Sequence, residues 1–260
     1  MRIKLLLIFL IGLLQMNNIA AQDIQDYEKH VLIDGTDTLP YRVLLPVNYR
    51  PSEKYPLLLF LHGAGERGND NMAQLVHGGK LFVKDSIRLK FPAIVVFPQC
   101  PQNSFWSNVD FKMNGDKRVL QFKPDGEPTA AMRMLLLLLP KLQKDFSINK
   151  SQVYVGGLSM GGMGTFELVN RMPKTFAAAF AVCGGGNTAS AKQLSKTAWW
   201  IFHGEEDPIV PYQLSLDMYE AIRQTGAEVR MSLYPTVDHS SWDIAFKEKE
   251  LLGWLFKHKK

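Results

Sequence analysis

Short apolar runs alternate with longer amphipathic stretches along most of this chain. Each run ends at glycine, proline or polar residues, and the runs occupy residues 55–61, 93–97, 152–155, 176–182, 198–202 and 229–234. Helical periodicity is found at residues 129–146, 160–171, 212–225 and 242–257. Continuous apolar runs are typical of strands that are buried on both faces. The pattern therefore predicts a single open, mostly parallel sheet that is flanked by helices.

A β-hairpin is expected upstream of these runs. Residues 28–34 and 39–45 form two extended stretches on either side of the turn sequence Asp34-Gly35-Thr36-Asp37. An Asp-Gly turn between two such stretches is a strong hairpin signal. We therefore expect the structured part of the chain to begin with two paired strands.

The first 21 residues have the pattern of a secretory signal peptide. Arg2 and Lys4 precede an apolar run at residues 5–14, and small residues end the segment at Ala21. Ten residues span about 15 Å as a helix, half of a hydrocarbon core of about 30 Å, so no stable membrane anchor is expected. We predict cleavage near Ala21 and export of a mature chain of residues 22–260, which form one domain.

The composition is that of a folded globular protein. Of the 260 residues, 46% are apolar and 21% are charged, which is enough apolar material for the core of one α/β domain. The formal net charge of +5 falls by two, to +3, if Arg2 and Lys4 leave with the signal peptide. So small and dispersed an excess gives no reason to expect a nucleic-acid partner.

A candidate nucleophile lies between an expected strand and an expected helix. Residues 157–161 read Gly-Leu-Ser-Met-Gly and fit G-x-S-x-G, the sharp turn that exposes a serine hydroxyl. Glycine is needed there because the strand and the helix come too close for side chains. An idle glycine-rich turn is the weaker interpretation in this context. We predict that Ser159 is the nucleophile.

A serine nucleophile needs a base that removes its proton, and three histidines follow Ser159 in the sequence. His258 lies in the lysine-rich C-terminus, and His203 ends an expected strand, where a structural role is the simpler interpretation. His239 follows the last expected strand, which fits the chain order serine, acid, histidine. We predict that His239 is the base.

The acid that orients the base is expected in the loop after residues 198–202. Asp207 is favoured because two prolines, Pro208 and Pro211, restrict the loop around it. Glu205, Glu206 and Asp238 are the alternatives. Asp238 is adjacent to His239 in the sequence, but neighbouring side chains in an extended loop tend to point apart.

Backbone amides are expected to stabilise the oxyanion that forms during acyl transfer. One should be the amide of Met160, the residue after the nucleophile. The second should come from residues 62–68, His-Gly-Ala-Gly-Glu-Arg-Gly, with Ala64 as the first choice and Gly65 as the second. A phosphate-binding loop is the other interpretation, but these residues lack the Gly-Lys-Ser/Thr ending of nucleotide loops.

Five motifs together resemble the α/β-hydrolase superfamily. They are residues 62–68, Pro98-Gln99-Cys100-Pro101 followed by Trp106, residues 157–162, residues 203–207, and His239-Ser240-Ser241-Trp242. More narrowly, the chain is similar to secreted carboxylesterases related to dienelactone hydrolases, phospholipase/carboxylesterases and feruloyl or acetylxylan esterases. The resemblance covers nearly all of residues 22–260. It implies an eight-stranded sheet, a Ser159–His239–Asp207 triad, no metal and no cofactor.

The sheet order of that superfamily also separates the two cysteines. The strands that end at Cys100 and Cys183 would have two other strands between them, which places the cysteines about 14 Å apart. This separation is too large for a disulfide. We therefore expect two free thiols, and neither lies in a nucleophile turn.

Residues 102–128 form a connection that is longer than an ordinary loop, and no large cap domain is expected. Long loops in compact domains are usually functional or disordered, and several aromatic side chains make disorder the weaker interpretation. We expect the segment to fold over the site as a partial lid. Trp106 within it, and Trp242 after the base, are candidate substrate-binding side chains; packing in the core or at the rim is the alternative.

Together these features predict an exported serine carboxylesterase that forms an acyl-enzyme on Ser159. The expected substrates are small-molecule esters, or acyl and feruloyl esters of polysaccharides. A serine peptidase of the prolyl-oligopeptidase type is one alternative, although such enzymes usually carry a gating domain for which 260 residues leave no room. A catalytically silent binding protein on the same fold is the other, and an intact set of serine, acid and histidine argues against it.

Overall fold

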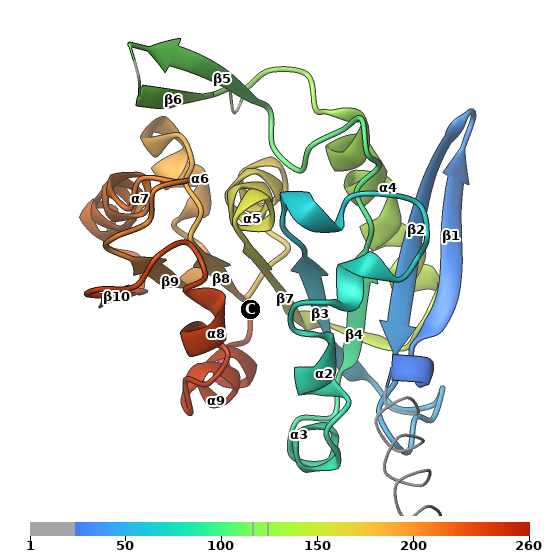
Figure 1. The fold of residues 1–260 in the computed structure, drawn as a ribbon. Coiled ribbons are helices and arrows are strands. Elements are labelled where there is room, and N and C mark those ends of the chain that lie inside the picture. The colour runs from blue at the N-terminus through green and yellow to red at the C-terminus, as the bar shows by residue number, and fades with distance from the viewer. Residues whose placement is uncertain (1–23, 116, 124) are drawn as a thin grey trace, which may run out of the picture.

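The computed structural model describes residues 24–115, 117–123 and 125–260. The predicted signal peptide lies outside the described residues. An eight-stranded sheet forms the centre of the molecule, in the order β1-β2-β4-β3-β7-β8-β9-β10 (Figure 1). Its strands are β1 (Glu28–Asp34), β2 (Asp37–Leu44), β3 (Tyr55–Leu61), β4 (Ile94–Pro98), β7 (Ile148–Leu158), β8 (Ala178–Val182), β9 (Ala198–Gly204) and β10 (Val229–Tyr234).

The sheet is mixed but mostly parallel, as predicted. The predicted hairpin is present as the antiparallel pair β1–β2, and β2 also runs antiparallel to β4. The pairs from β4 through β3, β7, β8 and β9 to β10 are all parallel. The carboxyl ends of these parallel strands therefore meet at one edge of the sheet, where ligands bind in such folds.

Side chains from successive positions of the central strands enter two separate apolar layers. Leu57, Leu59 and Leu61 of β3 belong to one cluster of buried side chains, whereas Leu58 and Phe60 belong to the other. This two-residue period, with apolar side chains on both faces, explains why the strands are continuous apolar runs in the sequence.

Helices cover both layers (Figure 1). The first cluster includes side chains of α4 (Ala130–Asp145), α5 (Met160–Arg171), α6 (Ala191–Leu194) and α7 (Gln213–Gln224). The second includes side chains of α2 (Gly79–Phe82), α8 (Trp242–Ala245) and α9 (Leu251–Lys257), with α3 (Asp85–Lys90) packed beside them. None of the helices in the described part of the chain is long and apolar enough to span a bilayer.

The predicted C-terminal helix over residues 242–257 is divided in the structure. It forms α8 and α9, which are separated by residues 246–250. Residues 247–250 are Lys-Glu-Lys-Glu, so they offer no apolar side chain to the core, and the chain turns there. The turn allows Ala245 and Leu251 both to be buried.

The long segment after β4 contains a second, two-stranded sheet that was not predicted. Strands β5 (Val109–Asn114) and β6 (Lys117–Phe122) pair in an antiparallel hairpin. A signal for it exists in the sequence, because apolar and polar residues alternate over 109–114 and Asn114-Gly115 follows. Gly115 has a φ of 60°, as tight hairpin turns require.

The hairpin is anchored to the nucleophile helix. The buried carboxylate of Glu167 on α5 accepts hydrogen bonds from the Ser107 hydroxyl at 2.9 Å and the Asn108 amide at 2.5 Å. Glu167 also forms an ion pair with Arg171, which donates to the carbonyl oxygen of Gly126. Both ends of the hairpin are therefore fixed to α5.

The two cysteines are buried and free, as predicted.

Candidate active site

Ser159 lies in a strained turn between β7 and α5. Its φ of 52° and ψ of −117° are unusual for a residue other than glycine. A methyl group at Gly161 would overlap the carbonyl oxygen of Leu61, and one at Gly157 would overlap the carbonyl group of Gly161. Only glycine at both positions allows this turn, which holds the serine at the carboxyl edge of the sheet.

The structure brings Ser159, His239 and Asp207 together. The Nε2 atom of His239 lies 2.9 Å from Oγ of Ser159, and its Nδ1 atom lies 2.6 Å from Oδ2 of Asp207. In the sequence His239 is 32 positions from Asp207 and 80 positions from Ser159, so these residues meet only because the chain folds. This is the geometry of a nucleophile, a general base and an orienting acid.

The environment of Asp207 keeps its carboxylate ionised. Burial alone would raise its pKa, but hydrogen bonds outweigh burial and lower the pKa well below its usual range. The donors are the imidazoles of His203 and His239 and the amides of Val210 and Ile209. An ionised acid can stabilise the imidazolium that forms on the base.

The alternative acids and bases lie elsewhere. Glu205, Glu206 and Asp238 are exposed, and the carboxylate of Asp238 accepts a hydrogen bond from the nearby Ser240 amide. His258 contacts the carbonyl oxygen of Trp254. His203 contacts Asp207, but not from the side of the nucleophile: it is His239 that joins the carboxylate to Ser159.

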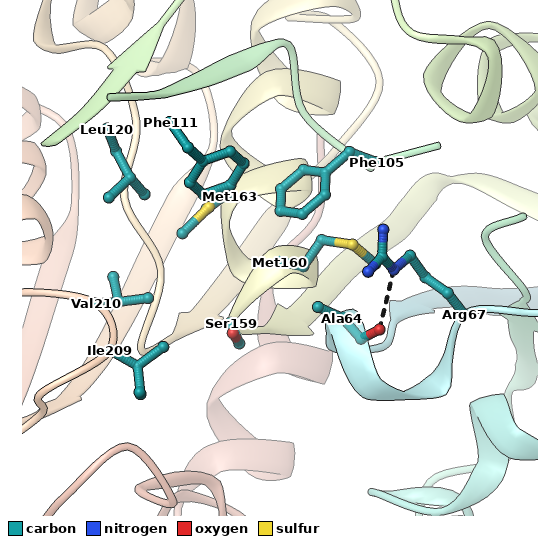
Figure 2. A pocket seen from close by; sticks show the side chains of 10 residues that line it. All are labelled: Ala64, Arg67, Phe105, Phe111, Leu120, Ser159, Met160, Met163, Ile209 and Val210. Atoms are coloured by element: carbon teal, nitrogen blue, oxygen red, sulfur yellow. Dashed lines mark hydrogen bonds between the residues drawn. The ribbon is translucent and has the colours of Figure 1, made fainter. Parts of the chain in front are cut away.

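The predicted oxyanion loop lies against the nucleophile turn. A methyl group at Gly63 would lie 2.8 Å from the Leu158 side chain and 3.8 Å from Cβ of Ser159. Ala64 follows in a short 3-10 helix, and both Ala64 and Met160 line the same cavity as Ser159 (Figure 2). The first choice for the second amide, Ala64, is thus placed beside the nucleophile.

His62, at the end of β3, braces this loop. It is fully buried, and burial lowers its pKa to about 4, so the ring is neutral at neutral pH. Its Nδ1 atom donates to the carbonyl oxygen of Gly63 at 2.6 Å, and its Nε2 atom accepts from the Cys100 amide at 2.9 Å. This role of His62 was not predicted from the sequence.

A cavity of about 300 Å³ opens at Ser159 (Figure 2). Apart from one arginine its wall is formed mainly by apolar side chains, and its lining residues are Ala64, Arg67, Phe105, Phe111, Leu120, Ser159, Met160, Met163, Ile209 and Val210. Phe111 and Leu120 come from the β5–β6 hairpin, so the hairpin does form one wall. The expectation that this segment folds over the site is consistent with this placement.

The guanidinium group of Arg67 is fixed by backbone oxygens. It donates through Nε to the carbonyl of Ala64 at 3.0 Å, and through Nη1 to the carbonyls of Gln102 and Ser104 at 3.3 Å each. These bonds join the oxyanion loop to the start of the long segment. Arg67 thus shapes the cavity by connecting two of its walls.

Neither of the two tryptophans that were predicted to bind substrate is among the described residues that line this cavity. Trp106 is fully buried; its Nε1 donates to the carbonyl oxygen of His62, and it packs so closely on Gly164 that a methyl group there would overlap it. Trp242 is half-buried and contacts the rings of His77 and His239. The expectation for Trp106 is therefore corrected to the alternative, packing beneath the segment.

Replacement of Trp106 by alanine should destabilise the protein rather than change its ester preference. Removing a fully buried indole leaves a cavity and costs about 3–5 kcal/mol in the free energy of unfolding. We expect a lower melting temperature and a similar loss of kcat/KM for acetyl and bulky aryl esters. A selective loss for aryl esters at an unchanged melting temperature would show that Trp106 binds substrate.

Cys183, Asp207 and His239 carry metal-ligating atoms that all lie within 4.8 Å of one another. Burial, and secondarily the Asp207 carboxylate, raise the pKa of the Cys183 thiol, so it stays protonated. A 2.6 Å hydrogen bond already joins Nδ1 of His239 to Oδ2 of Asp207. The group therefore fits a triad better than a metal site.

Comparison with known proteins agrees with this geometry. The sequence profile of the Phospholipase/Carboxylesterase family matches residues 47–249. The chain belongs to this family of α/β-hydrolases. Its sheet and helices are also those of a solved "thermostable esterase", to which it is 30% identical with a TM-score of 0.81, over 92% of this chain and 64% of that one.

Two curated proteins are more distant relatives of this chain. One is the "Bifunctional acetylxylan esterase/xylanase XynS20E" of Neocallimastix patriciarum, 26% identical over 66% of this chain and 22% of its own length. The other is the "Probable feruloyl esterase C" of Aspergillus oryzae, 24% identical over 66% of this chain and 56% of its own length. The chain thus spans well under two thirds of the length of either protein.

Proposed function

We propose that this hydrolase is a serine carboxylesterase that acts through an acyl-enzyme on Ser159. The observation that supports it most is the hydrogen-bonded set in which His239 lies 2.9 Å from Ser159 and 2.6 Å from Asp207. Family membership and the ester hydrolases among its relatives favour the same reaction class.

The geometry supports a two-step reaction. His239 takes the proton from the Ser159 hydroxyl as Oγ attacks the ester carbonyl, and the resulting oxyanion faces the amides of Met160 and Ala64. The tetrahedral species then breaks its bond to the alcohol oxygen, and His239 returns the proton to the leaving alcohol. A water molecule gives a proton to His239 as its oxygen attacks the acyl carbon. The bond from that carbon to Oγ of Ser159 then breaks, the carboxylic acid leaves, and His239 returns the proton to Oγ.

The cavity favours esters with an apolar or aromatic acyl or alcohol group. A volume of about 300 Å³ is at the lower end of the range for small-molecule sites, which suits one aryl group or a short acyl group. The rings of Phe105 and Phe111 meet edge-to-face at 5.4 Å and form its aromatic wall (Figure 2). Because distant relatives are named acetylxylan and feruloyl esterases, we propose acetyl or hydroxycinnamoyl esters of polysaccharides as substrates.

Paired substrates test this proposal against the alternatives. Acetyl, butyryl and feruloyl esters, free and polysaccharide-bound, should be compared with anilides and peptides of matched acyl groups. We expect turnover of esters and at least 100-fold lower turnover of the matched amides. Faster turnover of peptides would indicate a serine peptidase. Turnover of neither class, with binding retained, would indicate a silent binding protein.

Replacement of Phe111 by alanine should change ester preference. Phe111 is 46% exposed, so truncation leaves the core intact but removes one side of the cavity. We expect kcat/KM for feruloyl or naphthyl esters to fall about 3- to 10-fold, the effect of one half-buried aromatic contact, with little change for acetyl esters. An equal effect on both would contradict a role of the hairpin in ester selection.

We propose that residues 1–21 direct export of this enzyme. The basic start, short apolar stretch and small residues near position 21 support the proposal. N-terminal sequencing of protein recovered outside the cytoplasm is expected to begin at Gln22. Recovery of the uncleaved chain from the cytoplasm alone would contradict it.

A further inference from the structure

His203 is a fully buried imidazole that the proposed reaction does not use. It lies near the end of β9, where its Nε2 atom is 3.1 Å from Oδ2 of Asp207 and 2.9 Å from the carbonyl oxygen of Val210. Its Nδ1 atom is 2.7 Å from the hydroxyl oxygen of Ser215 on α7, and that oxygen is 3.0 Å from the carbonyl oxygen of Gly184. A continuous chain of hydrogen bonds therefore leads from α7 to the candidate acid.

The hydrogen-bond partners of Nε2 determine which nitrogen of the His203 imidazole carries a proton. A carboxylate and a carbonyl oxygen can only accept hydrogen bonds, so Nε2 must be a donor to both. His62 shows the opposite arrangement, because its Nε2 accepts from a backbone amide and its Nδ1 donates to a carbonyl. Each buried histidine is thus held in the protonation pattern that its neighbours require.

One oxygen of Asp207 consequently serves two imidazoles. Oδ2 accepts from His239 at 2.6 Å and from His203 at 3.1 Å, while Oδ1 accepts from the amides of Ile209 and Val210. Four donors fix the rotation and the plane of the carboxylate. A carboxylate that is shared by more donors is also a weaker proton acceptor toward each one.

We propose that His203 is a positioning residue for the acid of the triad. Its Nε2 hydrogen holds the Asp207 carboxylate in the orientation that His239 needs, and it limits how strongly the carboxylate holds the proton of His239. The inference rests on the proposed function, since it assumes that His239 is the base for Ser159.

Three titratable side chains face the Asp207 carboxylate, and each comes from a different part of the sheet. His203 approaches from β9, His239 from the loop after β10, and Cys183 from the end of β8. The thiol of Cys183 stays protonated because burial raises its pKa. A change in the pH dependence of activity after substitution at 203 therefore reports on the shared carboxylate and the base.

Two amide substitutions separate the hydrogen bond to Asp207 from the one to Ser215. In His203→Gln the amide nitrogen is three bonds from Cβ, as Nε2 is, and can donate to Asp207. In His203→Asn the amide nitrogen is two bonds from Cβ, as Nδ1 is. It can therefore reach Ser215 but not Asp207. Both variants are neutral and polar, so they differ mainly in which partner they keep. His258→Gln, at a largely buried histidine that contacts Trp254 and Glu228 and no triad residue, is the matched control for replacement of an imidazole by an amide.

We expect His203→Asn to lower kcat about 10- to 100-fold, the value of one hydrogen bond to a charged group, with KM changed less than about 2-fold. The acid limb of its pH profile should move to higher pH by about half a unit or more, because Asp207 then holds the proton of His239 more tightly. His203→Gln should restore most of kcat and the wild-type profile, and His258→Gln should leave both in place. Equal kcat and equal profiles for the Asn and Gln variants, at comparable melting temperatures, would overturn the proposal.

A measurement on the wild-type protein does not depend on how the variants fold or on turnover. Nitrogen-15 NMR of histidine-labelled protein is expected to show His203 protonated at Nε2 and His62 protonated at Nδ1. An unprotonated Nε2 on His203 would exclude the proposed donor even if every ester is hydrolysed. Failure of the proposed function would instead appear as a wild-type protein that hydrolyses no ester while the NMR result stands.

Discussion

Ser159→Ala is expected to lower kcat for ester hydrolysis by about 10⁴-fold or more while the fold remains intact. The hydroxyl is the only group lost, and alanine can take the same left-handed backbone conformation, with φ near 52°, at about the cost that serine has. Because the amide of Ser159 still bonds to the carbonyl oxygen of Val182, the turn should keep its shape. The measurement is kcat for a 4-nitrophenyl ester, with the melting temperature as the control for folding.

Covalent labelling provides an independent readout for the same variant. A fluorophosphonate should modify wild-type protein on the peptide that contains Ser159 and should leave Ser159→Ala unmodified. Substantial ester turnover by Ser159→Ala, or labelling at another serine, would show that the nucleophile has been assigned to the wrong residue.

His239→Ala is expected to have the second largest effect, a loss of about 10³-fold or more in kcat. His239 contacts both the nucleophile and the acid, so its removal leaves Ser159 without a base and Asp207 without its shortest imidazole contact. The protonated ring cannot accept the serine proton, so wild-type activity should rise as pH rises through the acid limb. The variant should lose this limb together with its activity.

The matched comparison for this variant is His203→Gln. Position 203 also faces Asp207, but its side chain lies behind the carboxylate and not between it and the serine. The base at 239 is therefore expected to be indispensable, whereas the donor at 203 can be replaced by an amide. A mild effect of His239→Ala beside a severe effect of His203→Gln would reverse the assignment of the base.

The nucleophile turn and its partners could be predicted because local signals fix them. Gly157 and Gly161 are required by backbone contacts at the turn, so the motif around Ser159 reflects a steric need that the sequence displays. His239 and Asp207 follow from chain order, since each parallel strand delivers its following loop to the same edge of the sheet. The order of the strands was likewise implied by resemblance and is observed.

Features that depend on distant contacts could not be predicted in the same way. The burial of Trp106 depends on Gly164, 58 positions later, whose lack of a side chain makes room for the indole. The positions of Leu120 and Met163 in the cavity wall depend on the hairpin folding back onto α5. The hairpin itself is a different case. The alternation of apolar and polar residues over 109–114 is a strand signal, but the segment was interpreted as one long loop because of its length.

The most direct test is to trap the covalent intermediate. Wild-type protein mixed with excess 4-nitrophenyl acetate, quenched in acid within one turnover and digested, should yield a peptide containing Ser159 that carries the mass of one acetyl group. The burst of 4-nitrophenol should match the amount of acetylated peptide, and Ser159→Ala should show neither. Steady ester turnover with no acetyl group on Ser159, or with the group on another residue, would contradict an acyl-enzyme mechanism at this serine.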